Sequence, residues 1–213
     1  MKHAFQITWI SLRDTYEEMF ILVGVNLLTL LLCIPVVTAP PALAGLHNLG
    51  FFIATEKRIE LSVYWQGFRE NLLYSWKLAA LNIFIFGVLG WDIWFYLGKV
   101  QSSWRVLGFV GIWILVIWLV AQLYIFPFLV RMEERKIFPL AKNAVLLTLA
   151  YPVFSLTAAL LLVLLLALSI ILPILFILIG LSFAAVMGAH ALRHGLEMVE
   201  EFRERQKDDL DEE

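Results

Sequence analysis

Long apolar stretches alternate with short charged segments along the chain. Residues 19–55, 106–130 and 143–192 contain no Asp, Glu, Lys or Arg. A helix needs roughly 20 apolar residues to cross a hydrocarbon core about 30 Å thick, and each of these stretches reaches that length. Because only a bilayer accounts for so many apolar stretches of this size, the pattern predicts an all-α fold, a polytopic transmembrane helical bundle.

About five transmembrane helices fit this pattern. As one helix, residues 143–192 would extend about 75 Å. They are therefore interpreted as two crossings, with Pro152 opening one helix and Pro173 marking the turn to the next. The prediction is one membrane domain over residues 1–192 and a charged cytoplasmic tail over residues 193–213. The predicted spans are residues 19–38, 76–97, 106–130, 153–171 and 174–192.

The segments between the spans are predicted to lie at the membrane surface. Residues 1–18 combine aromatic and charged side chains at helical spacing, which is typical of an interfacial helix. Two amphipathic elbows are expected over residues 56–71 and 137–151. The consecutive prolines 40–41 are expected to end the first span. Residues 42–55 are then too short to cross, so they are interpreted as re-entrant or interfacial.

The distribution of lysine and arginine predicts an orientation. With five spans, 12 of the 16 Lys and Arg residues fall on the side of the C-terminus. The other side holds four, namely Lys2, Arg13, Lys99 and Arg105. Because cytoplasmic segments carry the excess of Lys and Arg, this predicts an outside N-terminus and a cytoplasmic C-terminus.

Four polar side chains fall inside the predicted spans, namely Asn26, Asn82, Asp92 and Gln122. Polar groups are costly in hydrocarbon, so such residues either line a path for a polar solute or hydrogen-bond between helices. Asp92 lies near the outer end of its span. There it could bind a cation or a proton, accept a hydrogen bond from a sugar hydroxyl, or reach interfacial water. The sequence leaves these alternatives open.

The last span carries small residues on one face. Gly180, Ala184 and Gly188 recur at every fourth position. This spacing lets a neighbouring helix approach closely. We interpret the face as a helix-packing surface, within the bundle or in a dimer.

Two histidines lie one turn apart where the same span ends. His190 and His194 share a helix face with Glu197 and Glu201. Two such histidines could bind a divalent metal ion together with a carboxylate. A hydrated helix end needs no such ligand, so the main interpretation is a solvated face and the metal site is a weak candidate.

Composition and motifs narrow the function. Hydrophobic residues make up 62% of the chain and charged residues 16%, and the net charge of −2 gives no reason to expect nucleic acid as a partner. The sequence has no Walker-type loop, no G-x-S-x-G, no H-E-x-x-H and only one cysteine, Cys33. We therefore expect a protein that is not an enzyme and holds no cofactor, with the lipid bilayer as its first partner.

The stretch from Asn26 to Ala44 resembles the signature of the YesL-like family. It starts with Asn-Leu-Leu and ends, from Leu32, with Leu-Cys-Ile-Pro-Val-Val-Thr-Ala-Pro-Pro-Ala-Leu-Ala. These are bacterial integral membrane proteins with a domain of unknown function. Residues 67–71, Gly-Phe-Arg-Glu-Asn, are similar to a further family feature, as are Asp92 and residues 142–144, Lys-Asn-Ala. Ile34 departs from the leucine expected before Pro35.

The resemblance implies a location in the bacterial cell membrane and an association with carbohydrate uptake. Members of this family often accompany importers of the ATP-binding-cassette type. The expected function is thus an accessory role in carbohydrate uptake, with such an importer or a second copy of the chain as partner. The alternative is a transporter that moves a small solute itself.

Overall fold

Helices and short turns make up nearly all of the part of the chain that the computed structural model describes, which comprises residues 2–55, 57, 59–98, 103–132 and 136–211. This confirms the predicted all-α fold. In chain order the elements are α1 (Lys2–Glu17), α2 (Met19–Cys33), the 3₁₀-helix η1 (Val36–Thr38), α3 (Ala39–Ala54), α4 (Leu61–Glu70), α5 (Leu72–Gly98), α6 (Arg105–Arg131), α7 (Ile137–Ala150), α8 (Pro152–Ile171), α9 (Pro173–Leu175), the π-helix η2 (Phe176–Gly180) and α10 (Leu181–Asp211).

Four helical segments are long and apolar enough to cross a membrane, and they are Val36–Ala54, Leu72–Gly98, Arg105–Arg131 and Pro173–Gln206. Two further pairs, α1 with α2 and α7 with α8, pass the same requirement together, although they bend by 92° and 104°. Counting each bent pair as one span raises the number to six. The spans expected at residues 76–97 and 106–130 correspond to α5 and α6.

The first expected span, residues 19–38, is interrupted. Helix α2 ends at Cys33, and Pro35 with an extended backbone separates it from η1. The prolines at 40–41, expected to stop a helix, instead lie in the first turn of α3. Proline is tolerated there because the first N–H groups of a helix have no intrahelical acceptor. Residues 39–54 thus form a full helix within one of the four apolar segments.

The last helix does not end with the apolar sequence. The expected turn at Pro173 is present, since α8 ends at Ile171 and α9 starts at Pro173. However, α10 continues through the predicted boundary at residue 193 to Asp211. The charged tail favours helix because Arg193 pairs with Glu197 and Arg205 with Glu201 one turn apart.

Helix α10 lies at the centre of the fold and packs against α1, α3 and α6. Its residues Ala185, Val186, Met187 and Ala189 are buried. The contact with α3 is close, because a Cβ on Gly50 would lie only 2.8 Å from the backbone carbonyl of Ala185. Small residues on both helices therefore set the distance between them.

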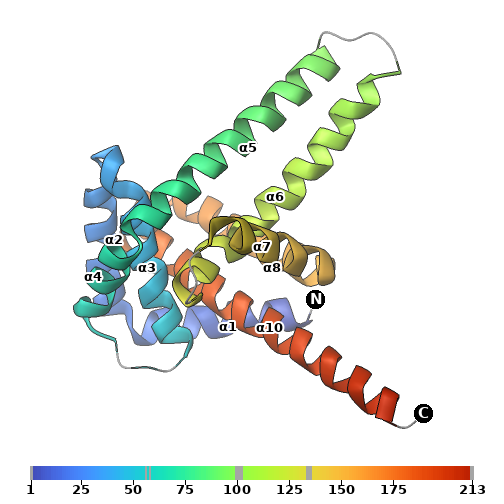
Figure 1. Cartoon of the computed structure of the whole chain (residues 1–213). Coiled ribbons are helices and arrows are strands. Elements are labelled where there is room, and N and C mark those ends of the chain that lie inside the picture. The colour runs from blue at the N-terminus through green and yellow to red at the C-terminus, as the bar shows by residue number, and fades with distance from the viewer. Residues whose placement is uncertain (1, 56, 58, 99–102, 133–135, 212–213) are drawn as a thin grey trace.

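Helices α5 and α6 form a long hairpin that projects from the other helices, with its tip far from the C-terminus (Figure 1). Only three residues of α5 are buried, namely Ser75, Leu78 and Leu89. The remaining apolar side chains of α5 are exposed or only partly covered by the chain itself. A bilayer or another apolar surface is needed to cover them.

Candidate functional site

Asn26 holds together α2 and the start of α10. The side chain is fully buried, and its Nδ2 donates to the carbonyl oxygens of Ile177 at 2.6 Å and Phe176 at 3.2 Å. Its Oδ1 accepts the backbone N–H of Ser182 at 2.9 Å. The side chain therefore satisfies backbone groups around the π-helix η2, where the regular helical pattern changes.

Asn82 and Gln122 join α5 to α6. Asn82 Oδ1 accepts from Gln122 Nε2 at 2.9 Å and from Trp118 Nε1 at 3.1 Å, while Asn82 Nδ2 donates to the Leu78 carbonyl of its own helix. The sequence did not single out Trp118 as a polar partner. A buried indole N–H needs an acceptor, so the three side chains form one interhelical network.

Asp92 lies further along the hairpin and faces Gly111 of α6. A Cβ on Gly111 would overlap the Asp92 Oδ2 atom. Asp92 is half-buried and lies ten residues beyond Asn82, about 15 Å along a helix. The structure thus joins Asn82 to Gln122 but places Asn26 and Asp92 at other helix contacts, and it does not bring the four predicted polar residues together around one path.

The small-residue face of α10 packs at only part of its length. A Cβ on Gly188 would lie 3.0 Å from the Leu123 carbonyl oxygen and 3.2 Å from Pro127, so α6 approaches closely there. A Cβ on Gly180 would instead meet the Phe176 ring of the adjoining turn. Ala184 is half-buried. The predicted packing role therefore has a structural basis at Gly188.

A polar cavity of about 550 Å³ lies between α1, the C-terminal end of α3 and α10. Helix α1 contributes Asp14 and Glu17 to its wall, and Glu18 follows directly after α1. Across it lie Lys57, just after α3, and Arg193 of α10. No motif in the sequence indicates this site, which brings together carboxylates and cations from distant parts of the chain.

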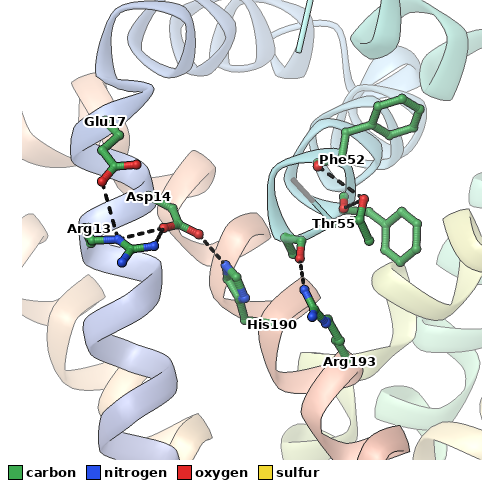
Figure 2. A network of polar contacts seen from close by, with 9 residues as sticks. Arg13, Asp14, Glu17, Phe52, Thr55, His190 and Arg193 are labelled. Atoms are coloured by element: carbon green, nitrogen blue, oxygen red, sulfur yellow. Dashed lines mark hydrogen bonds and ion pairs between the residues drawn. The ribbon is translucent and has the colours of Figure 1, made fainter. Parts of the chain in front are cut away.

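Charged contacts fix the helices around the cavity. Figure 2 shows Asp14 on α1 reaching His190 on α10, with Asp14 Oδ2 and His190 Nε2 2.9 Å apart. Arg13 lies beside them, 3.2 Å from Asp14 Oδ1. On the other side, Arg193 Nη1 donates to the Ala54 carbonyl at the end of α3, at 2.6 Å. The Asp14–His190 and Arg193–Ala54 contacts each join two of the elements that line the cavity.

The two candidate metal ligands lie at this cavity with different neighbours. His190 pairs with Asp14, whereas His194 lies against the rings of His3 and Phe154. The Nδ1 atom of His194 is 3.6 Å from Glu197. Within the described ranges, no three His, Cys, Asp or Glu side chains are grouped to hold an ion together. The geometry therefore favours helix contacts at these histidines.

Three of the basic residues used to predict the orientation line this cavity. That expectation placed Arg13 outside and both Lys57 and Arg193 in the cytoplasm. The structure brings all three to the same cavity, so α1 lies on the same side of the fold as the end of α3 and the tail of α10. Lys99, also expected outside, lies beyond the described residues.

Comparison with known proteins adds no relative, because no family model, no curated protein and no solved structure matches the chain. The likeness to the YesL-like family therefore rests on the sequence features given above.

Proposed function

We propose that the chain is a non-enzymatic, multi-pass protein of the bacterial cell membrane that assists a solute importer without forming the solute path itself. The observation that carries the proposal is the hydrogen bonding of the polar side chains within the apolar helices. Asn26, Asn82 and Gln122 all hydrogen-bond to other parts of the bundle. An amide engaged in this way stabilises helix packing and is not free to bind a moving solute.

The α5–α6 hairpin is the surface proposed to contact the importer. An apolar groove of about 450 Å³ runs between the hairpin and α7, lined by residues that include Phe84, Val88, Ile114 and Leu149. A transmembrane helix of a partner would cover this groove and the exposed side chains of α5. Asp92 gives the same hairpin an ionisable group, a type that is rare on surfaces facing only lipid.

The resemblance to the YesL-like family indicates the kind of importer. It favours a carbohydrate importer of the ATP-binding-cassette type, whose membrane-spanning subunit would occupy the groove. A second copy of the chain is the alternative partner. Identifying the proteins that co-purify with the chain distinguishes an importer subunit from a second copy.

The test is purification from native membranes combined with cysteine cross-linking. In a Cys33→Ser background, Val88→Cys on α5 should cross-link to an importer subunit. The matched variant Val163→Cys lies on α8 and is also exposed, at 60% against 50% for Val88. It should not cross-link to that subunit. Equal cross-linking from both sites, or recovery of the chain alone, would contradict the proposed role.

A second candidate function, solute transport by the chain itself, is favoured by the polar cavity between α1, α3 and α10. This cavity could admit a polar solute from one side of the membrane. Uptake of a labelled sugar by vesicles containing only the purified chain would support this candidate. Uptake that is unchanged in Asp92→Asn would show that Asp92 has no part in it.

The contacts at the cavity favour a revised orientation, with both termini in the cytoplasm. Placing α1 with the α10 tail leaves only Lys99 and Arg105 on the opposite side, against 14 of the 16 Lys and Arg residues. This asymmetry is stronger than that of the five-span arrangement. An even number of crossings, six at most by helix length and composition, is compatible with it.

A further inference from the structure

We propose that the polar cavity between α1, α3 and α10 binds a phosphoethanolamine group, either as a free molecule or as the headgroup of a lipid. Such a group carries a phosphate anion and a primary ammonium joined by a short link. Carboxylates predominate on the side of α1 and the residue that follows it, where Arg13 also lies, and this is called the acidic side. The side formed by the end of α3 and α10 carries Lys57 and Arg193 together with Glu197, and it is called the basic side. This inference is independent of the importer proposal, because it uses no surface of the α5–α6 hairpin.

The acidic side has one carboxylate, that of Glu18, that is available to a ligand. Both oxygens of Asp14 are engaged, Oδ1 by Arg13 and Oδ2 by His190. Glu17 lies 3.4 Å from Arg13 on the exposed part of α1. Glu18, at the corner between α1 and α2, has no hydrogen bond or ion pair through its side chain among the described residues. Glu18 can therefore accept the N–H groups of an incoming ammonium.

The basic side also has hydrogen-bond donors that are not engaged by the protein. Arg193 uses Nη1 for the Ala54 carbonyl and Nε for Glu197, so Nη2 remains available. The Lys57 ammonium lies 5.2 Å from the centroid of the Phe52 ring, and no carboxylate among the described residues pairs with it. Arg193 bonds to Ala54, which lies three residues before Lys57. Arg193 and Lys57 therefore belong to the same wall of the cavity. Together they offer several N–H donors to one phosphate.

The lining also selects between ammonium groups. A primary ammonium donates hydrogen bonds to carboxylates, whereas a quaternary ammonium has no N–H and is held by aromatic rings. The described lining residues include no Phe, Tyr or Trp side chain, the rings that usually enclose a quaternary ammonium. Ile10, Ile53 and Ile59 supply apolar contacts beside the charges. The chemistry thus favours phosphoethanolamine over phosphocholine, in a cavity large enough for a small ligand.

The test measures binding to the full-length protein by titration calorimetry in detergent, with phosphoethanolamine and phosphocholine as probes. Lys57→Gln and Glu18→Gln each remove one charge from the cavity without breaking a hydrogen bond that holds the helices. Lys142→Gln on α7 and Glu204→Gln on the tail are matched controls on exposed positions. A second arm compares the melting temperature in nanodiscs of phosphatidylethanolamine and of phosphatidylcholine.

We expect phosphoethanolamine to bind at least tenfold more tightly than phosphocholine. Each cavity variant should lower the affinity for phosphoethanolamine about tenfold, whereas the control variants should not change it. A higher melting temperature in phosphatidylethanolamine, lost in both cavity variants, identifies the lipid as the source. A response to the free molecule alone identifies a soluble ligand. Absence of selective binding in both arms overturns the proposal. Binding that the cavity variants leave unchanged, or that the controls weaken equally, also overturns it.

Discussion

Asn26 on α2 and Ser182 on α10 are joined by a hydrogen bond of 2.9 Å from the Ser182 backbone N–H to Asn26 Oδ1. The Ser182 hydroxyl makes a second hydrogen bond to α2 by donating to the Leu22 carbonyl at 3.0 Å. Two helices distant in the chain are thus linked at the point where η2 passes into α10. In an apolar environment, few other groups could satisfy these backbone atoms.

Replacing Asn26 with Leu should destabilise the fold. The variant removes a donor from the carbonyls of Phe176 and Ile177 and an acceptor from the Ser182 N–H. We expect the free energy of unfolding to fall by about 1–3 kcal/mol, the usual cost of leaving buried polar groups without partners. Unfolding in mixed detergent micelles measures the change. Thr157→Val, which affects an exposed hydroxyl bonded within α8, is the control and should be nearly neutral.

Glycines in contact with a neighbouring helix should respond to alanine differently from glycines in open space. Gly50→Ala places a methyl group against the Ala185 backbone and should cost about 1–3 kcal/mol, because neither backbone can easily move. Gly87 of α5 has nothing within 4 Å of an added Cβ. Gly87→Ala should instead stabilise the helix by about 0.5–1 kcal/mol. Equal changes in unfolding free energy at the two sites would refute the close approach of α3 and α10.

The network between α5 and α6 should appear as energetic coupling. In a double-mutant cycle of Asn82→Ala and Trp118→Phe, we expect a coupling of about 0.6–1.7 kcal/mol, as measured for hydrogen bonds between membrane helices. Trp113 lies on the same helix but is 70% exposed. A cycle with Trp113→Phe should therefore be additive. Coupling of the same size in both cycles would mean that the hydrogen bond to Asn82 is not its source.

The orientation can be measured by labelling single cysteines with a membrane-impermeant maleimide in intact cells. In a Cys33→Ser background, Trp104→Cys at the hairpin tip should react. Phe5→Cys on α1 and Phe202→Cys on α10 should react only after the cells are opened. All three positions are exposed, so access within the fold does not limit labelling. Reaction of Phe5→Cys in intact cells would restore the outside N-terminus predicted from the sequence.

The sequence predicts the helices well where local composition decides the structure. Apolar length alone located α5 and α6, and Pro152 and Pro173 mark helix starts as expected. The proline rule failed at residues 40–41, because a proline is compatible with the first turn of a helix and composition does not reveal where that turn begins. Local sequence thus fixes the existence of a helix more firmly than its ends.

The cavity could not be predicted because its residues meet only through tertiary packing. Asp14 and His190 are 176 positions apart, and neither lies in a recognisable motif. By contrast, Asn26, Asn82 and Gln122 were identified as polar residues within apolar helices. Their role in helix contacts was one of two alternatives until the partner atoms were known. Polarity within an apolar stretch indicates that a partner is needed, but not which one.

Tyr64 should make the stability of the protein depend on alkaline pH. This residue lies on α4, outside the apolar segments that could cross a membrane. Its side chain is fully buried against α2 and α3, with its hydroxyl 3.2 Å from Thr29 of α2. Burial raises the pKa of Tyr64 from its ordinary value of 10 to about 12, because the phenolate would be poorly solvated. The folded protein therefore holds this proton more tightly than the unfolded chain.

The stabilisation from the raised Tyr64 pKa is complete below about pH 10 and is lost as the pH rises towards 12. Between these values the wild type should lose unfolding free energy faster than Tyr64→Phe, which has no phenol to ionise at this position. Chemical unfolding at a series of pH values measures both slopes. Tyr16→Phe alters a tyrosine that is 76% exposed and should keep the wild-type slope. Parallel slopes for the wild type and Tyr64→Phe would show that burial on α4 does not hold the proton, and the close packing of Gly45 against Tyr64 would then need revision.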